Sequence, residues 1–585
     1  MENIEIGRIL NAYADLLDIE GENPFRIRSY RHAAQTVEGL SVPIERMIEG
    51  GEDVTELPGI GTSMAEHIRE ILRTGTLSAL ERLHREYPPT MTDLMRLETL
   101  GPKRARQLYD ALGITSVGQL AEALEAGSVE KLPGFGKKTA ANLRRAIENF
   151  ERYARRFLLA DAEQLIQPLL AHLREASGIK DLEVAGSYRR RKETVGDIDI
   201  LATCEDPQPV MQSFLAFREV EQVEAAGTTR GTVVLRSGLQ VDLRIVPQRS
   251  YGAALYYFTG SKAHNLAVRK MGVERGLSIN EYGVFRVAVG KAAGEGKPEK
   301  GRRVGGETEE DVFKAVDLVW VPPELREDRG EIQAAQRQTL PTLITLDDIR
   351  GDLQMHSTWS DGLQSIEAMA HACQSLGYDY CAVTDHSQST RVAGGLDAKA
   401  FRKQWKEIES IRRRLDGIVL LKGVELDILA DGSLDLPDEA IEGFDIVLIS
   451  VHSGLNMTRA QMTKRLCKAL AHPGVDILAH PTCRQINTRE PIDVDLEEVF
   501  RVAKEHDVAV EVDGQPQRLD LSDVHVHRAR ELGLKVVIDT DAHSVDQLRF
   551  MRYGVDQARR GWLEKPHVLN TLPWPEFRKW LGRRY

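Results

Sequence analysis

The spacing of apolar positions divides the chain into a helical first segment and two later segments that contain strands. In residues 1 to about 150, apolar side chains recur at helical spacing, as at Ile9, Tyr13 and Leu16, and Gly-rich turns interrupt them. We predict no strand there. Strand patterns begin near residue 183 with LEVAGS and continue with DIDILAT, TVVLRS and LQVDLRIVP. Helical stretches between these runs indicate a mixed α/β segment.

The middle of the chain is less regular. A helical segment and a compact strand pair are expected after residue 249, followed by the Pro-rich VWVPPEL (319–325). The polar run 326–345 predicts an interdomain linker. By pattern alone, YYFTGS (256–261) predicts an aromatic strand end that packs in a core and precedes a turn.

From about residue 349, short apolar strands alternate with helices. The expected strands are YCAVTDH, IVLLKGVEL, DIVLISVH, DILAHP, VAVEVD and KVVIDTDAH. Several of them end in His, Asp or Glu. Alternating strands and helices with polar residues at the strands' carboxyl ends are typical of an α/β barrel whose active site lies at that rim.

Composition limits the class of protein. A length of 585 residues requires several cores, and 42% hydrophobic with 28% charged residues is typical of globular protein. We find no apolar run long enough to span a bilayer and no basic N-terminal leader, so we expect a cytoplasmic protein without membrane contact. The five cysteines form no CxxC pair and are expected to be free thiols. The net charge of −12 means that any DNA contact must be local.

Two near-identical hairpins offer such a local contact. LPGIG (57–61) and LPGFG (132–136) each precede a helical pattern, and residues 97–113 form a looser third version. Glycines at such turns allow close backbone approach, and the following helix presents free N–H groups to a phosphate. Lysine or arginine follows the second and third hairpins. The residues expected to bind the DNA backbone are Gly59, Gly61, Lys103, Arg104, Gly134, Gly136, Lys137 and Lys138. This pattern resembles the helix-hairpin-helix motif of DNA repair proteins.

Three carboxylates suggest a divalent-metal site in the mixed α/β segment. Asp197 and Asp199 are two residues apart on a predicted strand and therefore share one face. Asp242 lies on another predicted strand. Hard oxygen ligands suit Mg²⁺ or Mn²⁺, and two such ions can activate a 3′-hydroxyl and stabilise a leaving pyrophosphate. Before them, the small turn Gly186-Ser187 can admit a triphosphate, to which the two arginines Arg189 and Arg190 would donate.

With these motifs, residues 1–320 resemble a family X DNA polymerase, the polymerase-beta family. The resemblance implies that Asp197 and Asp199 bind both metals and that Asp242 binds the catalytic one. It implies that Ser187 and Arg190 bind the β- and γ-phosphates. YFTGSKAHN (257–265) resembles the family's nucleotide-binding segment. The matching positions in and after it are Tyr257 and Phe258 against the sugar, Gly260 at a close backbone approach, Asn265 at the base edge and Arg269 on the template side, while Gly186 belongs to the turn that admits the triphosphate.

One position departs from the family. Relatives of polymerase beta carry a lysine, in the helix after the first hairpin, that forms a Schiff base with an abasic sugar. Here His67 stands at that position. Imidazole lacks the primary amine that this chemistry needs. We therefore predict weak or absent 5′-deoxyribose-phosphate lyase activity.

The second half contains six short segments with acidic or histidine residues, each at the end of a predicted strand. They resemble the metal-binding motifs of the PHP (polymerase and histidinol phosphatase) domain, a distorted barrel with a three-metal phosphoesterase site. The matching ligands are His356, Asp361, His386, Glu425, His452, His480, Asp541 and His543. Mixed imidazole and carboxylate donors suit Mn²⁺ or Zn²⁺. Where the family begins with HxH, this chain has Gln354-Met355-His356. An amide is a weak ligand, so we hypothesise one loosely held metal and a Mn²⁺-dependent nuclease.

The expected fold is multidomain, α+β followed by α/β. Its parts are a lyase-like helical domain (1–85), fingers (86–152), a nucleotidyltransferase palm (153–248), a thumb (249–320), a linker (321–346) and the PHP barrel (347–585). The resemblance implies a monomeric bacterial repair polymerase at the nucleoid. It would fill short gaps in base excision repair from dNTPs and carry a 3′–5′ exonuclease, with abasic-site cleavage in some relatives. Two alternatives stay open: a DNA-end-processing phosphoesterase, or a non-catalytic DNA-binding scaffold.

Overall fold

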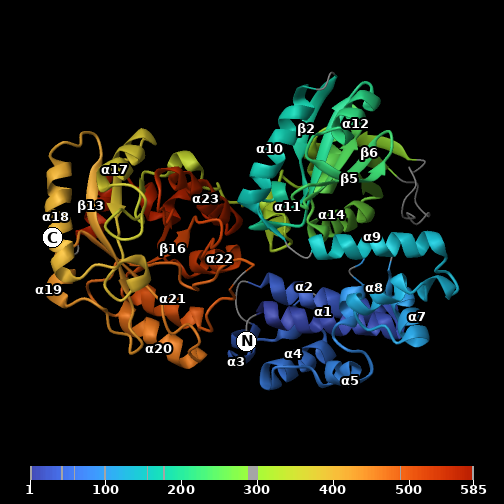
Figure 1. The fold of residues 1–585 in the computed structure, drawn as a ribbon, viewed down its shortest axis with the longest axis horizontal. Coiled ribbons are helices and arrows are strands. Elements are labelled where there is room, and N and C mark those ends of the chain that lie inside the picture. Colours follow the sequence, from blue (N-terminus) through green and yellow to red (C-terminus); the bar gives the residue numbers. More distant parts are fainter. Residues whose placement is uncertain are drawn as a thin grey trace. The chain divides into compact units, whose positions relative to one another are not determined.

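The chain folds as two compact units, Met1–Arg156 and Phe157–Tyr585. The computed structural model (Figure 1) describes residues 3–40, 44–57, 59–95, 97, 100–153, 156–175, 178–286, 301–487 and 489–582. Each unit has hydrophobic clusters of its own. Within the described residues, no helix combines the length and apolarity that a membrane crossing requires.

The described part of the first unit contains helices and no strand, as predicted. Its helices are α1 (Asn3–Glu20), α2 (Pro24–Gly39), α3 (Ile44–Glu49), α4 (Thr62–Thr74), α5 (Ser78–Glu86), α6 (Met91–Leu94), α7 (Pro102–Leu112), α8 (Val117–Glu125) and α9 (Lys137–Tyr153). Gly61 lies at the N-terminus of α4, and Gly75 ends that helix with a φ of 78°. A left-handed residue at this place favours glycine. The helices of residues 3–91 enclose one core, and those of residues 94–147 enclose a second.

A five-stranded sheet follows, in the order β2-β4-β7-β6-β5. Its strands are β2 (Ile179–Val184), β4 (Asp197–Cys204), β5 (Val220–Ala226), β6 (Arg230–Leu235) and β7 (Gln240–Ile245). The neighbours β4 and β7 run parallel. Figure 1 shows α10 (Leu159–Glu175) and α12 (Pro207–Leu215) beside this sheet. The short pair β1 (Phe157–Leu158) and β3 (Thr194–Val195) lies apart from it.

The next segment differs from the sequence prediction in three places. YYFT belongs to helix α13 (Tyr251–Thr259), not to a strand. The sequence pattern did not indicate a helix here because no residue of α13 is exposed, so apolar and polar positions do not alternate at helical spacing. Helix α14 (Lys262–Glu274) follows. The expected strand pair is a three-stranded sheet, formed by β8 (Leu277–Asn280), β9 (Gly283–Arg286) and β10 (Arg302–Gly305).

The third difference concerns the expected linker. Residues 321–346 include the short helices η4 (Pro323–Leu325) and α16 (Glu331–Arg337). Leu325 and Ile332 are buried in one cluster with residues of α13 and of α15 (Glu309–Lys314). Polar composition does not keep this segment solvated, because its few apolar side chains face that core.

The last domain is a parallel barrel of seven strands in sequential order. They are β11 (Gly351–Asp352), β12 (Tyr380–Val383), β13 (Val419–Asp427), β14 (Ile446–Ser450), β15 (Ile477–Leu478), β16 (Ala509–Asp513) and β17 (Val536–Asp539). A parallel bridge between Met355 and Ala542 joins the segments that follow the first and last strands. Every predicted strand of this half is present.

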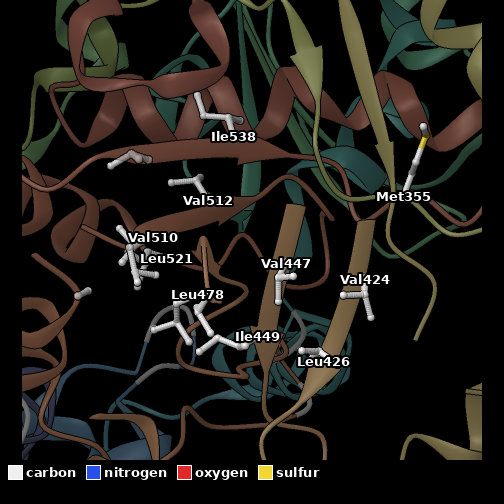
Figure 2. Packing of buried hydrophobic residues seen from close by; sticks show 14 of the residues in the cluster. Met355, Val424, Leu426, Val447, Ile449, Leu478, Val510, Val512, Leu521 and Ile538 are labelled. Carbon is white, nitrogen blue, oxygen red and sulfur yellow. The ribbon is translucent and has the colours of Figure 1, made fainter. Parts of the chain in front are cut away.

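Helices surround this barrel and cover its apolar outer residues. They include α17 (Ile366–Ser375), α18 (Ala398–Arg412), α19 (Asp438–Ile441), α20 (Arg459–Leu470), α21 (Leu496–Glu505), α22 (Asp523–Leu532) and α23 (Met551–Arg560). Figure 2 shows Val424 and Leu426 of β13 beside Val447 and Ile449 of β14 in this core. Alternate residues of one strand share a face, which is why these pairs are two apart. Helix α24 (Trp574–Leu581) packs on the opposite face of the strands, where its Phe577 is buried in one cluster with Ile446 and Leu448.

The barrel also contributes to the core of the five-stranded sheet. Leu519, from the loop after β16, and Tyr553 of α23 are buried in the cluster formed by α10, α12 and that sheet. Trp562, just after α23, is buried in the cluster of α13 and α15. Sheet and barrel are thus parts of one folded unit.

Candidate active sites and DNA-binding hairpins

Three carboxylates lie on the neighbouring strands β4 and β7. The register of these parallel strands places Asp199 directly beside Asp242. Asp197 lies two residues earlier on β4, on the same face. Asp242 is buried, and it accepts hydrogen bonds from the Thr232 hydroxyl and from Gln240 Nε2, the latter at 3.1 Å. The sequence therefore assigns all three acids to one surface, and the strand pairing brings them together.

The repulsion between these three carboxylates raises the pKa of one of them. Burial, together with the charges of Asp197 and Asp242, raises the pKa of Asp199 to about 7. A carboxyl group at this pKa is only partly ionised near neutral pH. Divalent cations between the three oxygens would restore the charged form, since they offset the like charges. The residues present therefore fit a divalent-metal site.

A tight turn faces these acids. Helix α11 (Gly186–Arg189) begins at Gly186, whose φ is 63°. A Cβ atom at Gly186 would lie 2.9 Å from Asp199 Oδ2, so a side chain there would press on the carboxylate. Ser187, half-buried, follows in the same turn. The turn thus provides space immediately beside the acids.

The two arginines after this turn differ in their contacts. Both terminal nitrogens of Arg189 donate to Glu309, at 2.7 and 2.8 Å, so this guanidinium is committed to a buried ion pair. Arg190 donates from Nε to Glu327 at 3.0 Å and from Nη1 to the Thr259 carbonyl at 2.5 Å. These contacts leave Nη2 of Arg190 outside the described hydrogen bonds. Only the second arginine is placed to reach a phosphate.

The predicted nucleotide-binding segment lies at the junction of α13 and α14. The rings of Tyr257 and Phe258 lie 5.2 Å apart at the end of α13, and both are half-buried. Gly260 has a φ of 71°, and a Cβ atom there would come within 3.1 Å of Arg190 Nη1. Asn265 Nδ2 donates to the Tyr257 carbonyl at 2.7 Å. This segment therefore adjoins the Arg190 guanidinium.

Asn265 and Arg269 are one turn apart on α14. Asn265 Oδ1 is buried without a hydrogen-bond partner among the described residues, so an acceptor is available. Arg269 is exposed. Arg244 of β7, which the sequence patterns did not single out, places its guanidinium 4.4 Å from the centre of the Phe258 ring.

The hairpins have the expected backbone. Gly59 and Gly134 have φ values of 77° and 82°, which favour glycine. Gly61 is the N-terminal cap of α4. Gly136 is exposed immediately before α9. The cationic residues predicted to follow the hairpins are all exposed: Lys103, Arg104, Lys137 and Lys138.

His67 lies on α4, half-buried, and its Nδ1 is 2.8 Å from the Tyr30 hydroxyl. The chain supplies no lysine before Lys103, so no other side-chain amine is present in the segment that precedes it.

In the barrel, the eight predicted ligands meet around Glu425, at the carboxyl ends of the strands. Glu425 Oε1 lies 2.8 Å from His480 Nε2 and 3.2 Å from His452 Nε2. Its Oε2 lies 3.0 Å from His386 Nδ1 and 3.5 Å from His356 Nε2. One buried carboxylate thus joins four imidazoles that come from four different strand ends.

Two further acids complete the cluster. Asp541 Oδ1 lies 2.9 Å from His356 Nε2. Asp361 Oδ2 lies 3.4 Å from His543 Nε2 and 3.6 Å from His386 Nε2. The cluster opens into a cavity of about 250 Å³. Its lining consists of Asp361, His386, Thr390, Val392, Ala393, His452, His480, Arg518, Asp541 and His543.

The acids and imidazoles hold one another in charged forms. Although burial opposes charge, His386 and His452 keep the pKa of Glu425 well below its usual range. Against the same burial, Glu425 and Asp427 raise the pKa of His452 to about 10. Asp361 and Asp541 likewise raise the pKa of His543 to about 9. The protonated imidazoles therefore carry positive charge that bound metal ions would otherwise supply, and metal binding would displace their protons.

The donor set fits metal ions. Three overlapping groups bring ligand atoms within 4.8 Å of one another: His356, Asp361, His386 and His543; His386, Glu425 and His452; and His356, Glu425 and Asp541. The Nδ1 atoms of His356 and His480 are buried without a hydrogen-bond partner among the described residues. The palm acids do not form such a compact group within the described part of the chain.

Gln354 is fully buried, and its amide faces the Glu511 carboxylate, to which the amide nitrogen donates once the amide group is flipped. The contact between the Gln354 amide and Glu511 thus occupies the side chain that stands where the family has a histidine. Sequence reasoning missed two neighbours of the cluster. Asp427 lies 3.6 Å from His452 Nδ1, and period two on β13 could have placed it beside Glu425. Arg518, 3.8 Å from Asp541, comes from a loop without a pattern.

Comparisons with known proteins match successive parts of the chain to five families. The family models are the helix-hairpin-helix domain (residues 1–77), the SAM-like helix-hairpin-helix tandem (91–149), the DNA polymerase beta palm (159–240), the DNA polymerase beta thumb (254–327) and the PHP domain (352–513). The DNA polymerase/3′-5′ exonuclease PolX of Bacillus subtilis is 36% identical over 585 residues, which is the full length of both chains.

More distant relatives match only part of the chain. DNA polymerase lambda of Rattus norvegicus is 24% identical over 56% of each chain. DNA polymerase lambda of Arabidopsis thaliana is 26% identical over 55% of this chain and 60% of its own length. Hairpin domains, palm, thumb and PHP barrel in this order define a multidomain, metal-dependent DNA polymerase. The chain belongs to the PolX family of DNA polymerases, which is the family X identified from its motifs.

Proposed function

We propose that this enzyme fills short gaps in DNA by adding dNTPs to a 3′-hydroxyl and trims 3′ ends with its PHP domain. The observation that carries the polymerase half is the alignment of Asp199 beside Asp242, with Asp197 on the same face. Mg²⁺ or Mn²⁺ bound there would activate the 3′-hydroxyl and stabilise the pyrophosphate. The three carboxylates would hold and orient these ions.

The surrounding residues support a role in nucleotide binding. Gly186 keeps the turn open beside Asp199, and Ser187 follows it with a hydroxyl donor. Arg190, with Nη2 outside its described contacts, would bind the β- and γ-phosphates. The remaining positions proposed to contact the nucleotide or the template are Tyr257, Phe258, Gly260, Asn265 and Arg269.

The PHP cluster supports a 3′–5′ exonuclease. Mn²⁺ or Zn²⁺ held there would supply a hydroxide near neutral pH and bind non-bridging phosphate oxygens. Glu425 would orient the imidazoles around it, and Arg518 places a fixed positive charge in the same cavity. The exposed hairpin lysines would bind the DNA backbone independently of sequence. We propose that a monomer performs both activities.

We further propose that the first domain lacks 5′-deoxyribose-phosphate lyase activity. His67 replaces the expected amine, and the first lysine of the chain is Lys103. Borohydride trapping on DNA with an incised abasic site should yield no covalent adduct to residues 1–85. A trapped adduct that maps to a side chain in those residues would contradict this proposal.

The polymerase proposal is tested with Asp242→Asn. Replacing a buried acid by its amide keeps its shape but removes the charge that a metal needs. Primer extension on gapped DNA should fall by about 10²- to 10³-fold, the size expected when a positioned electrostatic group is lost. Degradation of a labelled 3′ end should persist. Extension at the wild-type rate would refute the assignment of this site.

Gln222→Glu is a suitable control because Gln222 lies on β5, the far edge strand of the same sheet. Gln222→Glu converts an amide into a carboxylate, the reverse of the exchange in Asp242→Asn, at a position away from the three acids. Extension by this variant should match that of the wild type.

A further inference from the structure

The loop that carries the triphosphate-binding arginine is fastened to the PHP domain. Arg191 Nη2 lies 2.5 Å from Asp556 Oδ2 on α23. Glu193 accepts a hydrogen bond from Arg484 Nη2 at 2.7 Å. Arg190, immediately before these two anchors, is therefore part of an interface and not of a free palm loop.

Arg560 of the PHP domain contacts Arg190 once directly and once through Glu327. Its Nη1 donates to the Arg190 carbonyl at 2.7 Å and lies 3.1 Å from Glu327 Oε1. The same Glu327 oxygen accepts from Arg190 Nε at 3.0 Å. Arg560 thus holds the backbone of Arg190 directly and its guanidinium through a shared carboxylate.

Arg560 is itself immobilised. Its side chain is 2% exposed, and its Nη2 donates to Asp523 of α22 at 2.6 Å. A guanidinium can make several such bonds at once because its donors form a rigid, planar fork. Removing it would take away one of the two guanidinium groups that contact the Glu327 carboxylate, in surroundings where a lost charge partner is costly.

The consequence concerns preorganisation. Arg190 has a long, flexible side chain, and ordering such a side chain only when the ligand binds weakens binding. The contacts with Glu327 and Thr259 fix it before a nucleotide arrives. Without Arg560, Arg190 loses the donor that holds its carbonyl, and Glu327 loses one of the two guanidinium groups that fix its position.

We propose that Arg560, in the PHP domain, is a positioning residue of the polymerase site that holds Arg190 for the β- and γ-phosphates of the incoming nucleotide. This inference rests on the proposed phosphate-binding role of Arg190. It means that the PHP domain is a structural component of the nucleotide site in addition to carrying its own metal cluster.

The test measures KM for dNTP and kcat on single-nucleotide gapped DNA with the full chain. Arg560→Met should raise KM by about 3- to 10-fold with a smaller change in kcat, because the preorganisation of one side chain acts on binding. Arg560→Lys should recover only part of this loss, since one ammonium group cannot bridge the same three partners. Exonuclease activity on single-stranded DNA should stay at the wild-type level and reports that the barrel is folded.

Arg559→Met is the matched control. Arg559 is the preceding residue of α23, and its Nε donates to Glu324 at 2.8 Å without contacting Arg190. The same substitution there removes an interdomain ion pair of similar kind. It should leave KM for dNTP within about twofold of the wild type.

The outcomes separate the inference from the proposed function. If Arg190→Met raises KM and Arg560→Met does not, the positioning role is overturned and the proposed function stands. If Arg190→Met leaves KM unchanged, the phosphate-binding role itself fails. An equal rise in Arg559→Met overturns the inference, because the effect is then general loosening of the interface. If Arg560→Met loses its exonuclease through misfolding, Arg560→Lys decides, and a wild-type KM in that folded variant overturns the inference.

Discussion

Leu519 belongs to the PHP domain in sequence but to the palm in packing, which makes the shared core directly testable. It lies in the loop between β16 and α22, and it is 3% exposed in the hydrophobic cluster of α10, α12 and the five-stranded sheet. Leu519→Ala should open a cavity between the two domains. Such truncations of a buried leucine cost about 2–5 kcal/mol.

The expected shift in melting temperature follows from the size of the unit. Residues from Phe157 onward form one compact body of roughly 400 residues, whose unfolding entropy is about 0.9 kcal/mol per degree at about 2.1 cal/mol/K per residue. A loss of about 3 kcal/mol therefore lowers the main transition by about 3 °C. Differential scanning calorimetry of the full chain measures this shift. Palm and barrel should melt in the same transition in the wild type.

Leu363→Ala provides the control, since Leu363 lies in the same domain but is 71% exposed. Its cost should be within about 0.5 kcal/mol, which corresponds to less than about 1 °C. Equal shifts for the two variants, or no shift for Leu519→Ala, would refute the conclusion that the domains share a core.

Three further predictions concern the metal cluster and the hairpins. The raised pKa values of His452 and His543 keep both imidazoles protonated near pH 7, so Mn²⁺ binding should release about two protons and weaken as the pH falls. Calorimetry in two buffers of different ionisation enthalpy measures the number of protons released. An affinity that does not change between about pH 6 and 8 would contradict this prediction. Gln354→His should raise exonuclease activity at limiting Mn²⁺, and the absence of an increase would show that the Gln354 amide does not weaken metal binding. Replacing Lys137 and Lys138 together by alanine should weaken gapped-DNA binding and reduce the salt dependence by about two charges, whereas the same change at the exposed Lys399 and Lys403 of α18 should not.

The parts predictable from sequence are those encoded by local periodicity. Asp197 and Asp199 share a face because a strand repeats every two residues, and the structure has both on β4. The barrel ligands were recognisable because apolar strands run directly into His480 or His543. The same reasoning failed for Tyr256 and Tyr257, since a helix buried on all sides has no polar face that distinguishes it from a strand.

Contacts between residues far apart in sequence had no local signal. The pair of Arg191 and Asp556 spans 365 positions, and neither residue lies in a motif. The packing of Leu519 in the palm depends on where the barrel docks, which no periodicity records. The burial of Ile332 within the expected linker had no local signal either, because the core that surrounds it is formed by residues far earlier in the sequence, such as Ala253 and Tyr256.

The central claim, that one chain carries two independent active sites, is tested most directly with a labelled gapped substrate in Mn²⁺, with and without dNTPs. Asp197→Ala should lose extension and keep 3′ degradation. His386→Ala, which removes a ligand that contacts both Glu425 and Asp361, should lose degradation and keep extension. Loss of both activities in either variant, or persistence of both in either, would contradict the account.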